Sequence, residues 1–248
     1  MIESVKKAVD ILSCFTQDEP VLGNSEIAEK LGLSRSTTHH LVSTLSNKGV
    51  LMRDSNRKYR LGWKLLEWNN NVMFQKDIYN KALPLVKGLV QRFQGTVHIG
   101  MFDKGDVIFV LKVSSADSLE ISTYLGARKP AYSTSTGKVL LSSNPAYLEE
   151  TISRGLLSQA PNTITDINLL KKDLEIVRKN GYSISNNEND TGTYAIAAPI
   201  LSYSGQTIAA VNLVGPIAYM QGSERNNMIQ CVVNTAKEIS QELGYIEL

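Results

Sequence analysis

The segment SRSTTHHLVSTLSNKGVL, residues 34–51, decides how the first part of this chain folds. Ser34 is a typical helix N-cap residue, and the glycine near the other end is a typical helix stop, so the segment predicts a helix ending near residue 48. Its apolar stripe consists of Leu41, Val42 and Leu45. The opposite side would expose a row of compact polar or cationic side chains: Arg35, Ser36, Thr37, His39, His40 and Ser43.

Two further helices are predicted before this segment, and a hairpin is predicted across its end. Apolar spacing indicates a helix over residues 2–15, and Asn24 is predicted to be the N-cap of a second helix. Alternation within residues 51–61 indicates two short strands joined by turn residues. The order helix, helix, turn, helix, hairpin over residues 1–62 is that of a winged helix-turn-helix.

The composition of the third helix favours double-stranded DNA as its partner. Arg can bond guanine bidentately, while Ser and Thr can bond either bases or phosphates. An exposed helix usually carries Glu–Lys pairs, yet no acidic residue lies between Ser34 and Arg53. The alternative is a three-helix bundle with a merely solvated polar face. On the wing, Arg57, Lys58 and Arg60 are predicted to contact the sugar-phosphate backbone.

The charge distribution agrees with this hypothesis. The net charge is only +2, but residues 1–62 hold nine Lys or Arg against seven Asp or Glu. Residues 48–60 alone hold five cations and one anion. Such a patch is modest but is the kind that phosphate backbones attract, although a solvated charged loop would look similar.

Composition bounds the class of protein. With 42% hydrophobic and 20% charged residues, the chain is typical of globular proteins. Its longest apolar run, residues 194–201, is far shorter than the ~20 residues that cross a bilayer, and the N-terminus lacks a signal-peptide cleavage site. Cys14 and Cys231 are isolated and are predicted to be buried small hydrophobic residues. We therefore expect a cytoplasmic protein without membrane partner, metal, cofactor or catalytic residues.

The remainder predicts an antiparallel sheet with packed helices, of α+β class. A helical pattern over residues 62–93 contains Pro84, which should break or kink it, and a polar stretch at residues 69–77 is the expected hinge. Hairpins are predicted around turns at residues 103–106 and 202–205, with helices near residues 136–141, 146–154, 167–180 and 223–243. The expected domains are residues 1–62, a linker helix and hinge at 63–77, and an effector-binding and oligomerisation domain at 78–248.

Several motifs, taken in order, resemble the IclR family of bacterial transcription regulators. They are SVKKAVDILSCF, EIAEKLGLSRSTTHHLVSTLSNKGVL, YRLG, LGARKPAYSTSTGKVLL, GYSISNNEND and GTYAIAAPI. The resemblance implies a winged helix-turn-helix, a linker helix and a GAF-like effector domain. It further implies that a homodimer or dimer of dimers binds an operator and that a small metabolite alters its DNA affinity. One departure is His40, where the family often has Arg.

Residues 133–138, STSTGK, suggest an anion site. They are not a Walker loop, which would need glycine at position 132 and Ser or Thr at position 139. A loop that enters a helix nevertheless presents N–H groups and the helix dipole to an anion. The resemblance implies effector contacts at Ser135, Thr136, Ser185, Ala195 and Asn212.

The expected effector is a small organic acid, either sugar-derived or aromatic. Relatives that bind two- or three-carbon oxoacids tend to carry an acidic residue, a Cys and paired Ser in this pocket. The matching positions in this chain are Ser185, Ala195, Asn212 and Val214. These replacements imply a different ligand.

Other polar residues favour simpler interpretations. His98 is predicted to be a core or surface residue in preference to a metal ligand, since no ligand spacing supports it. Lys138 is predicted to be a solvated helix residue, although it could reach an anionic effector. Residues 186–188 are predicted to form a surface turn, although Asn186, Asn187 and Glu188 could add polar contacts to the effector. An enzyme with an appended DNA-binding head is the alternative function, but three histidines, two of them in the reading helix, give it little support. A winged helix that binds protein would expose an apolar stripe instead.

Overall fold

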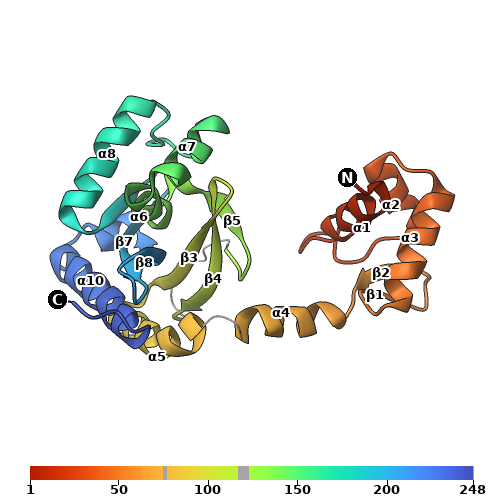
Figure 1. The fold of residues 1–248 in the computed structure, drawn as a ribbon, viewed down its shortest axis with the longest axis horizontal. Coiled ribbons are helices and arrows are strands. Elements are labelled where there is room, and N and C mark those ends of the chain that lie inside the picture. The colour runs from red at the N-terminus through yellow and green to blue at the C-terminus, as the bar shows by residue number, and fades with distance from the viewer. Residues whose placement is uncertain (75–76, 117–122, 248) are drawn as a thin grey trace. The chain divides into compact units, whose positions relative to one another are not determined.

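The chain folds into two compact units, Met1–Lys76 and Asp77–Leu248 (Figure 1). The computed structural model describes residues 1–74, 77–116 and 123–247. Each unit has its own apolar core. A separate linker at residues 63–77 stays a prediction.

The first unit has the predicted order of a winged helix-turn-helix. Its elements are α1 (Glu3–Ser13), α2 (Asn24–Leu31), α3 (Arg35–Asn47), β1 (Leu51–Arg53), β2 (Tyr59–Leu61) and α4 (Lys64–Phe74). Strands β1 and β2 pair as an antiparallel hairpin. Ile11, Ile27, Val42 and Leu51 are fully or almost fully buried together, which packs α1, α2, α3 and the hairpin on one core.

The helix starts explain how α2 and α3 are placed. Ser34 caps α3 as predicted, because its Oγ accepts the Thr37 N–H at 3.1 Å. The prediction for α2 was wrong by one residue, since Gly23 is the N-cap and its N–H donates to a Glu26 carboxylate oxygen at 2.6 Å. Asn24 instead donates its side-chain amide to the Arg35 carbonyl at 3.0 Å, which ties the two helix starts together.

The second unit is built on an antiparallel sheet of order β5-β4-β3-β8-β7-β6. Its strands are β3 (Thr96–Asp103), β4 (Asp106–Ser114), β5 (Arg128–Pro130), β6 (Ser183–Asn186), β7 (Thr193–Leu201) and β8 (Thr207–Pro216). Its helices are α5 (Asp77–Phe93), η1 (Ala131–Ser133), α6 (Ser135–Ser143), α7 (Pro145–Ser153), α8 (Ile167–Asn180), α9 (Ile217–Met220) and α10 (Arg225–Glu242).

Helices cover both faces of this sheet, as Figure 1 shows. One core joins α5 and α10 to the sheet, and a second core joins α6 and α8 to its other face. Because successive side chains of a strand point to opposite faces, Val97 and Ile99 enter the first core while His98 points to the α6 side. The α+β class is confirmed, and the strand alternation fixes which residues face α6.

Two details differ from the sequence predictions. A break or a kink was predicted at Pro84, but helix α5 continues from Asp77 to Phe93, so a break is wrong. Pro84 is exposed, so the carbonyl that loses its N–H partner lies near the surface. Cys14 and Cys231 are free, but both are only partly buried.

Candidate DNA-binding face and effector cavity

The outer side of α3 exposes most of the predicted DNA contacts. Arg35, Ser36, His39 and His40 are exposed, while Thr37 and Ser43 are partly buried. The sequence did not reveal that Thr38 is fully buried, where its hydroxyl donates to the Ser34 carbonyl at 3.1 Å. The structure therefore offers a cationic side chain and short polar groups on one helix.

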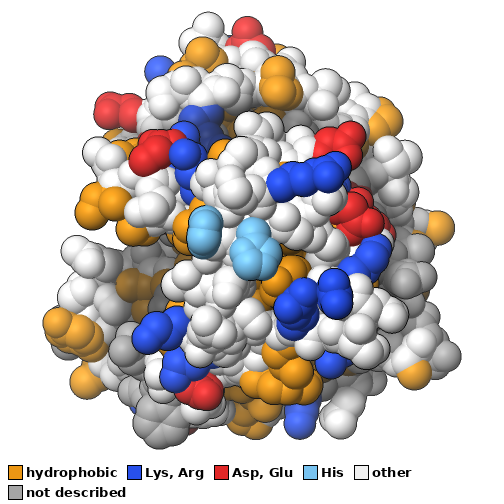
Figure 2. All heavy atoms as spheres, turned by 90° about the vertical axis from the view of Figure 1, so that its right-hand side faces the viewer, with side chains coloured by type: hydrophobic (Ala, Val, Ile, Leu, Met, Phe, Trp, Pro, Cys, Tyr) orange, Lys and Arg blue, Asp and Glu red, His pale blue; other side chains and the backbone are white. Residues whose placement is uncertain are grey.

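This face carries positive charge that the protein itself does not neutralise. Within the described part of the chain, Arg35, Arg57 and Arg60 have no carboxylate within ion-pair distance. Figure 2 shows two histidines near the middle of the face, with Lys and Arg side chains on either side. Unpaired guanidinium groups beside short hydroxyls are suited to phosphates and base edges.

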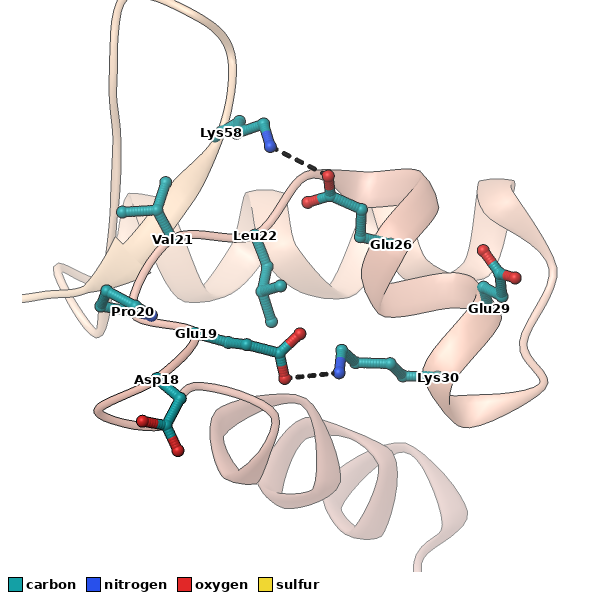
Figure 3. Close-up of a pocket in the computed structure, with 9 residues that line it drawn as sticks. All are labelled: Asp18, Glu19, Pro20, Val21, Leu22, Glu26, Glu29, Lys30 and Lys58. Atoms are coloured by element: carbon teal, nitrogen blue, oxygen red, sulfur yellow. Dashed lines mark hydrogen bonds and ion pairs between the residues drawn. The ribbon is translucent and has the colours of Figure 1, made fainter.

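The three cations predicted to contact DNA from the wing differ in their surroundings. Arg57 lies in the turn with φ 61°, and Arg60 is exposed on β2. Lys58 forms an ion pair with Glu26, with 2.9 Å between Nζ and Oε1 (Figure 3). The sequence missed this pair because the two residues are far apart along the chain. Arg53, also exposed on the wing, lies over the Tyr59 ring at 5.7 Å.

Behind the wing lies a groove of about 560 Å³ (Figure 3). It is lined by Asp18, Glu19, Pro20, Val21, Leu22, Glu26, Glu29, Lys30 and Lys58. Two of its carboxylates are paired, Glu26 with Lys58 and Glu19 with Lys30 at 2.7 Å. Four carboxylates against two lysines make this groove unsuited to a phosphate backbone.

The second site is a small cavity of about 40 Å³ between the sheet and the start of α6. A cavity that holds benzene needs about 150 Å³, so the present shape accommodates only a few water-sized groups. Four of the five predicted effector residues line it. The described lining is His98, Phe109, Thr123, Lys129, Thr134, Ser135, Ser185, Asn189, Asp190, Thr193, Ala195, Asn212 and Val214.

The start of α6 presents hydrogen-bonding groups that the protein leaves unpaired. Thr134 is the N-cap, and its hydroxyl oxygen accepts the Gly137 N–H at 3.0 Å. Ser135 lines the cavity, and its buried hydroxyl has no partner among the described residues. Thr136, the fifth predicted effector residue, is fully buried with an unpaired hydroxyl but does not line the cavity. An unpaired hydroxyl at the positive end of a helix dipole is chemically suited to an anion.

A buried histidine also lines the cavity. The His98 ring contacts the Asn212 Oδ1 through Nδ1 at 3.1 Å and the Thr123 hydroxyl through Nε2 at 2.7 Å. Burial lowers the pKa of His98 from 6.5 to about 4; the hydrogen bond to Asn212 opposes this shift, and the charge of Lys112 adds to it. His98 is therefore a neutral cavity residue at neutral pH. The sequence signal that could have indicated its burial was its position on an apolar strand, between Val97 and Ile99.

Two predictions about polar residues near this cavity were wrong. Lys138 is almost completely buried and lies 2.9 Å from a Glu188 oxygen and 3.0 Å from an Asp173 oxygen. Glu188, predicted to lie in a surface turn, is also buried, and burial raises the pKa of its carboxyl above its usual range. This buried cluster joins α6, α8 and the loop after β6. The two residues that follow Glu188 in this loop line the cavity.

Those two residues, Asn189 and Asp190, are tied to the loop before α6. The Ser133 hydroxyl donates to Asn189 at 3.0 Å, and Lys129 forms an ion pair with Asp190 at 3.0 Å. Sequence reasoning missed Asn189, Asp190 and Lys129 as cavity residues, because nothing in the sequence shows which long-range loops meet.

Neither unit displays a metal centre in the parts of the chain that the structure describes. No group of three or more potential His, Cys, Asp or Glu ligands occurs there. Among the described helices, none is long and apolar enough to span a membrane.

Comparison with known proteins decides the family. The model for the bacterial transcriptional regulator IclR C-terminal domain matches residues 70–241, and the model for the IclR helix-turn-helix domain matches residues 4–55. The chain belongs to the IclR family of bacterial transcriptional regulators. It is 30% identical to the HTH-type transcriptional regulator XynR of Escherichia coli, over 99% of this chain and 98% of that protein.

Solved IclR structures have the same fold. The Thermotoga maritima IclR matches with a TM-score of 0.80 and 30% identity, over 99% of this chain and 100% of that one. An IclR homologue from Microbacterium hydrocarbonoxydans, complexed with 4-hydroxybenzoate, matches with a TM-score of 0.87 and 25% identity, over 97% and 99% of the two chains. This IclR-family chain thus combines a DNA-binding helix-turn-helix with an effector-binding domain.

Proposed function

We propose that this IclR-family regulator is a repressor that binds its operator as a homodimer or dimer of dimers and that a small organic acid modulates its operator affinity. The observation that carries the DNA part is the outer face of α3, with unpaired Arg35 beside short hydroxyls and two histidines. Arg35, Ser36, Thr37, His39, His40 and Ser43 would read the major groove. Arg57 and Arg60 would contact the backbone of the duplex.

Lys58 remains a proposed backbone contact, but a weaker one. Its ammonium group would have to leave Glu26 before it met a phosphate. Because both side chains are substantially exposed, solvent screens that ion pair and it adds little stability, so exchange for a phosphate is feasible.

The proposed effector site is the cavity at the start of α6, which would have to widen to admit an organic acid. Ser135, Ser185, Ala195 and Asn212 would then contact the effector, and Thr136 would join them if the widening reached it. A carboxylate matches the unpaired Ser135 hydroxyl and the positive end of the helix dipole. The 4-hydroxybenzoate in the Microbacterium homologue is a carboxylate of this kind.

Self-association is proposed from exposed apolar side chains on the first unit. Ile2, just before α1, and Val5 and Val9 within it recur at helical spacing and are exposed. Trp63, just before α4, and Leu66 in its first turn are exposed as well. Contiguous exposed apolar surface marks interaction sites in soluble proteins, and a second copy of this unit would bury it. A regulator of this kind would act in the cytoplasm, where the chromosome lies.

In the proposed mechanism, the effector redistributes two conformations of the dimer. A ligand shifts such an equilibrium only if it binds the DNA-competent and DNA-incompetent states unequally. The helix and hinge at residues 63–77 would carry the change to the DNA-binding heads.

Genome-wide footprinting tests this function. The expected result is a small set of protected sites with two-fold symmetry, located at promoters whose transcription rises when the gene is deleted. Transcription that falls on deletion would make the protein an activator, and the absence of any protected site would refute operator binding. We find no observation that favours the alternative of an enzyme with a DNA-binding head.

A further inference from the structure

The cavity contains a chain of hydrogen bonds whose direction can be assigned. The backbone N–H of His98 donates to the Asn212 Oδ1 at 3.0 Å, and a backbone N–H can only donate. The atom that accepts must therefore be the amide oxygen of Asn212, which settles the orientation of this side chain. The same oxygen lies 3.1 Å from the His98 Nδ1, so Nδ1 carries a proton and donates it.

The remaining ring nitrogen is then an acceptor. His98 is buried and neutral, so a proton on Nδ1 leaves a lone pair on Nε2. Thr123 Oγ1 lies 2.7 Å from Nε2 and donates its only proton to it. Lys112 reinforces the position of Thr123, because its ammonium group donates to the Thr123 carbonyl.

These hydrogen bonds decide which groups remain for a ligand. Asn212 has its oxygen occupied, so its side chain has only amide N–H groups left to offer, and these have no partner among the described residues. The unpaired hydroxyl of Ser135 lines the same cavity, and both residues are more than nine-tenths buried. Thr123 has used its proton on His98 and presents only oxygen lone pairs.

We propose that His98 sets the specificity of this cavity for a hydroxycarboxylic acid. The carboxylate of the ligand accepts from Asn212 and from the start of α6, and its hydroxyl donates to Thr123. An acid without the hydroxyl leaves Thr123 without a donor, and a buried unpaired oxygen disfavours binding. This inference rests on the proposed effector cavity and specifies its ligand class.

The assignment of the ring proton can be tested without any ligand. Long-range proton–nitrogen NMR of the full chain reports the protonation of the three histidines, and His98→Gln identifies the His98 signals. We expect a neutral ring with its proton on Nδ1 at pH 7. A proton on Nε2, or a charged ring, would overturn the proposal while leaving DNA binding untouched.

The ligand class is tested with matched acids that differ by one hydroxyl. Calorimetry on the full chain would compare lactate with propionate and 4-hydroxybenzoate with benzoate, alongside glycolate and glycerate. We expect at least one hydroxylated acid to bind at least 10-fold more tightly than its partner, and the pair that binds distinguishes a short acid from an aromatic one. Equal affinity within the binding pair, or no binding by any hydroxylated acid, would contradict the proposal.

Variants at Thr123 separate specificity from folding. Thr123→Val should abolish the preference for the hydroxylated acid, and Thr123→Ser should retain it. Thr151→Val removes a buried hydroxyl that donates to the Tyr147 carbonyl outside the cavity, so it is the matched control and should keep the preference. Loss of the preference in Thr123→Ser or in the Thr151 control, or its survival in Thr123→Val, would refute the role of the Thr123 oxygen.

Discussion

Arg35 stands at the first position of α3 with an exposed guanidinium group and no carboxylate partner among the described residues. Side chains at the N-terminal end of a recognition helix meet base edges, and Arg prefers guanine. We expect Arg35→Ala to weaken operator binding by roughly 1–3 kcal/mol and to relax sequence preference at one base pair. Fluorescence anisotropy with operator variants measures both effects. Unchanged affinity and specificity would exclude Arg35 from base contact.

His98 should make the stability of the second unit depend on pH. Its pKa is about 4 in the folded protein against 6.5, so the unfolded chain binds more protons between these values. Stability from this residue is therefore complete above pH 6.5 and is lost as the pH falls towards 4, by up to about 3 kcal/mol.

Denaturant titrations of wild type and His98→Gln at several pH values measure this dependence. Subtracting the two curves cancels the carboxylates, including Glu188, whose raised pKa acts in the opposite direction. A His98→Gln curve as steep as that of the wild type between pH 6.5 and 4 would contradict a neutral buried His98.

Two neighbouring cations of the wing should contribute unequally to the salt dependence of DNA binding. Arg57 is exposed without a carboxylate partner in the described chain, whereas the neighbouring Lys58 is paired with Glu26. Each phosphate contact contributes about 0.9 to the slope of log affinity against log salt. We expect Arg57→Ala to reduce this slope by about 1 and Lys58→Ala to reduce it less. Equal reductions would show that the pair opens fully on DNA.

Helix α6 depends on a glycine for its approach to η1. A Cβ on Gly137 would overlap the backbone of Ala131, so any side chain there displaces the start of α6 and the cavity wall. We expect Gly137→Ala to lower the free energy of unfolding by more than 2 kcal/mol. Gly88→Ala is the control, because Gly88 is exposed in α5 with open space around it. This variant should raise the free energy of unfolding by about 0.5–1 kcal/mol. Chemical denaturation measures both, and equal effects would refute the close-packing argument.

Sequence patterns predicted the elements better than the sites. The periodicity of α3, its Ser34 cap and the turns of the hairpins depend on neighbouring residues, so they can be read locally. Pairs such as Lys58 with Glu26, or Lys138 with Glu188, join residues that are distant in sequence. Lys138 was predicted to be solvated because a lysine on a helix is usually exposed, and only the tertiary fold shows the carboxylates that allow its burial.

At the scale of the whole molecule, the family motifs predicted four residues that the structure brings to one cavity. Ser135, Ser185, Ala195 and Asn212 come from α6, β6, β7 and β8, and no local rule joins them. The contact between His98 and Thr123 was not predicted, because no sequence pattern relates these two residues. The directions of their hydrogen bonds required coordinates.

The most direct test of the account is a salt-dependent titration of the wild-type chain on a footprinted duplex and on a scrambled duplex of equal length. We predict at least 10³-fold tighter binding to the footprinted site, a steep loss of affinity with salt, and two or four chains bound per site. Equal affinity for both duplexes, or no retention on either at low salt, would contradict the claim that the outer face of α3 reads DNA.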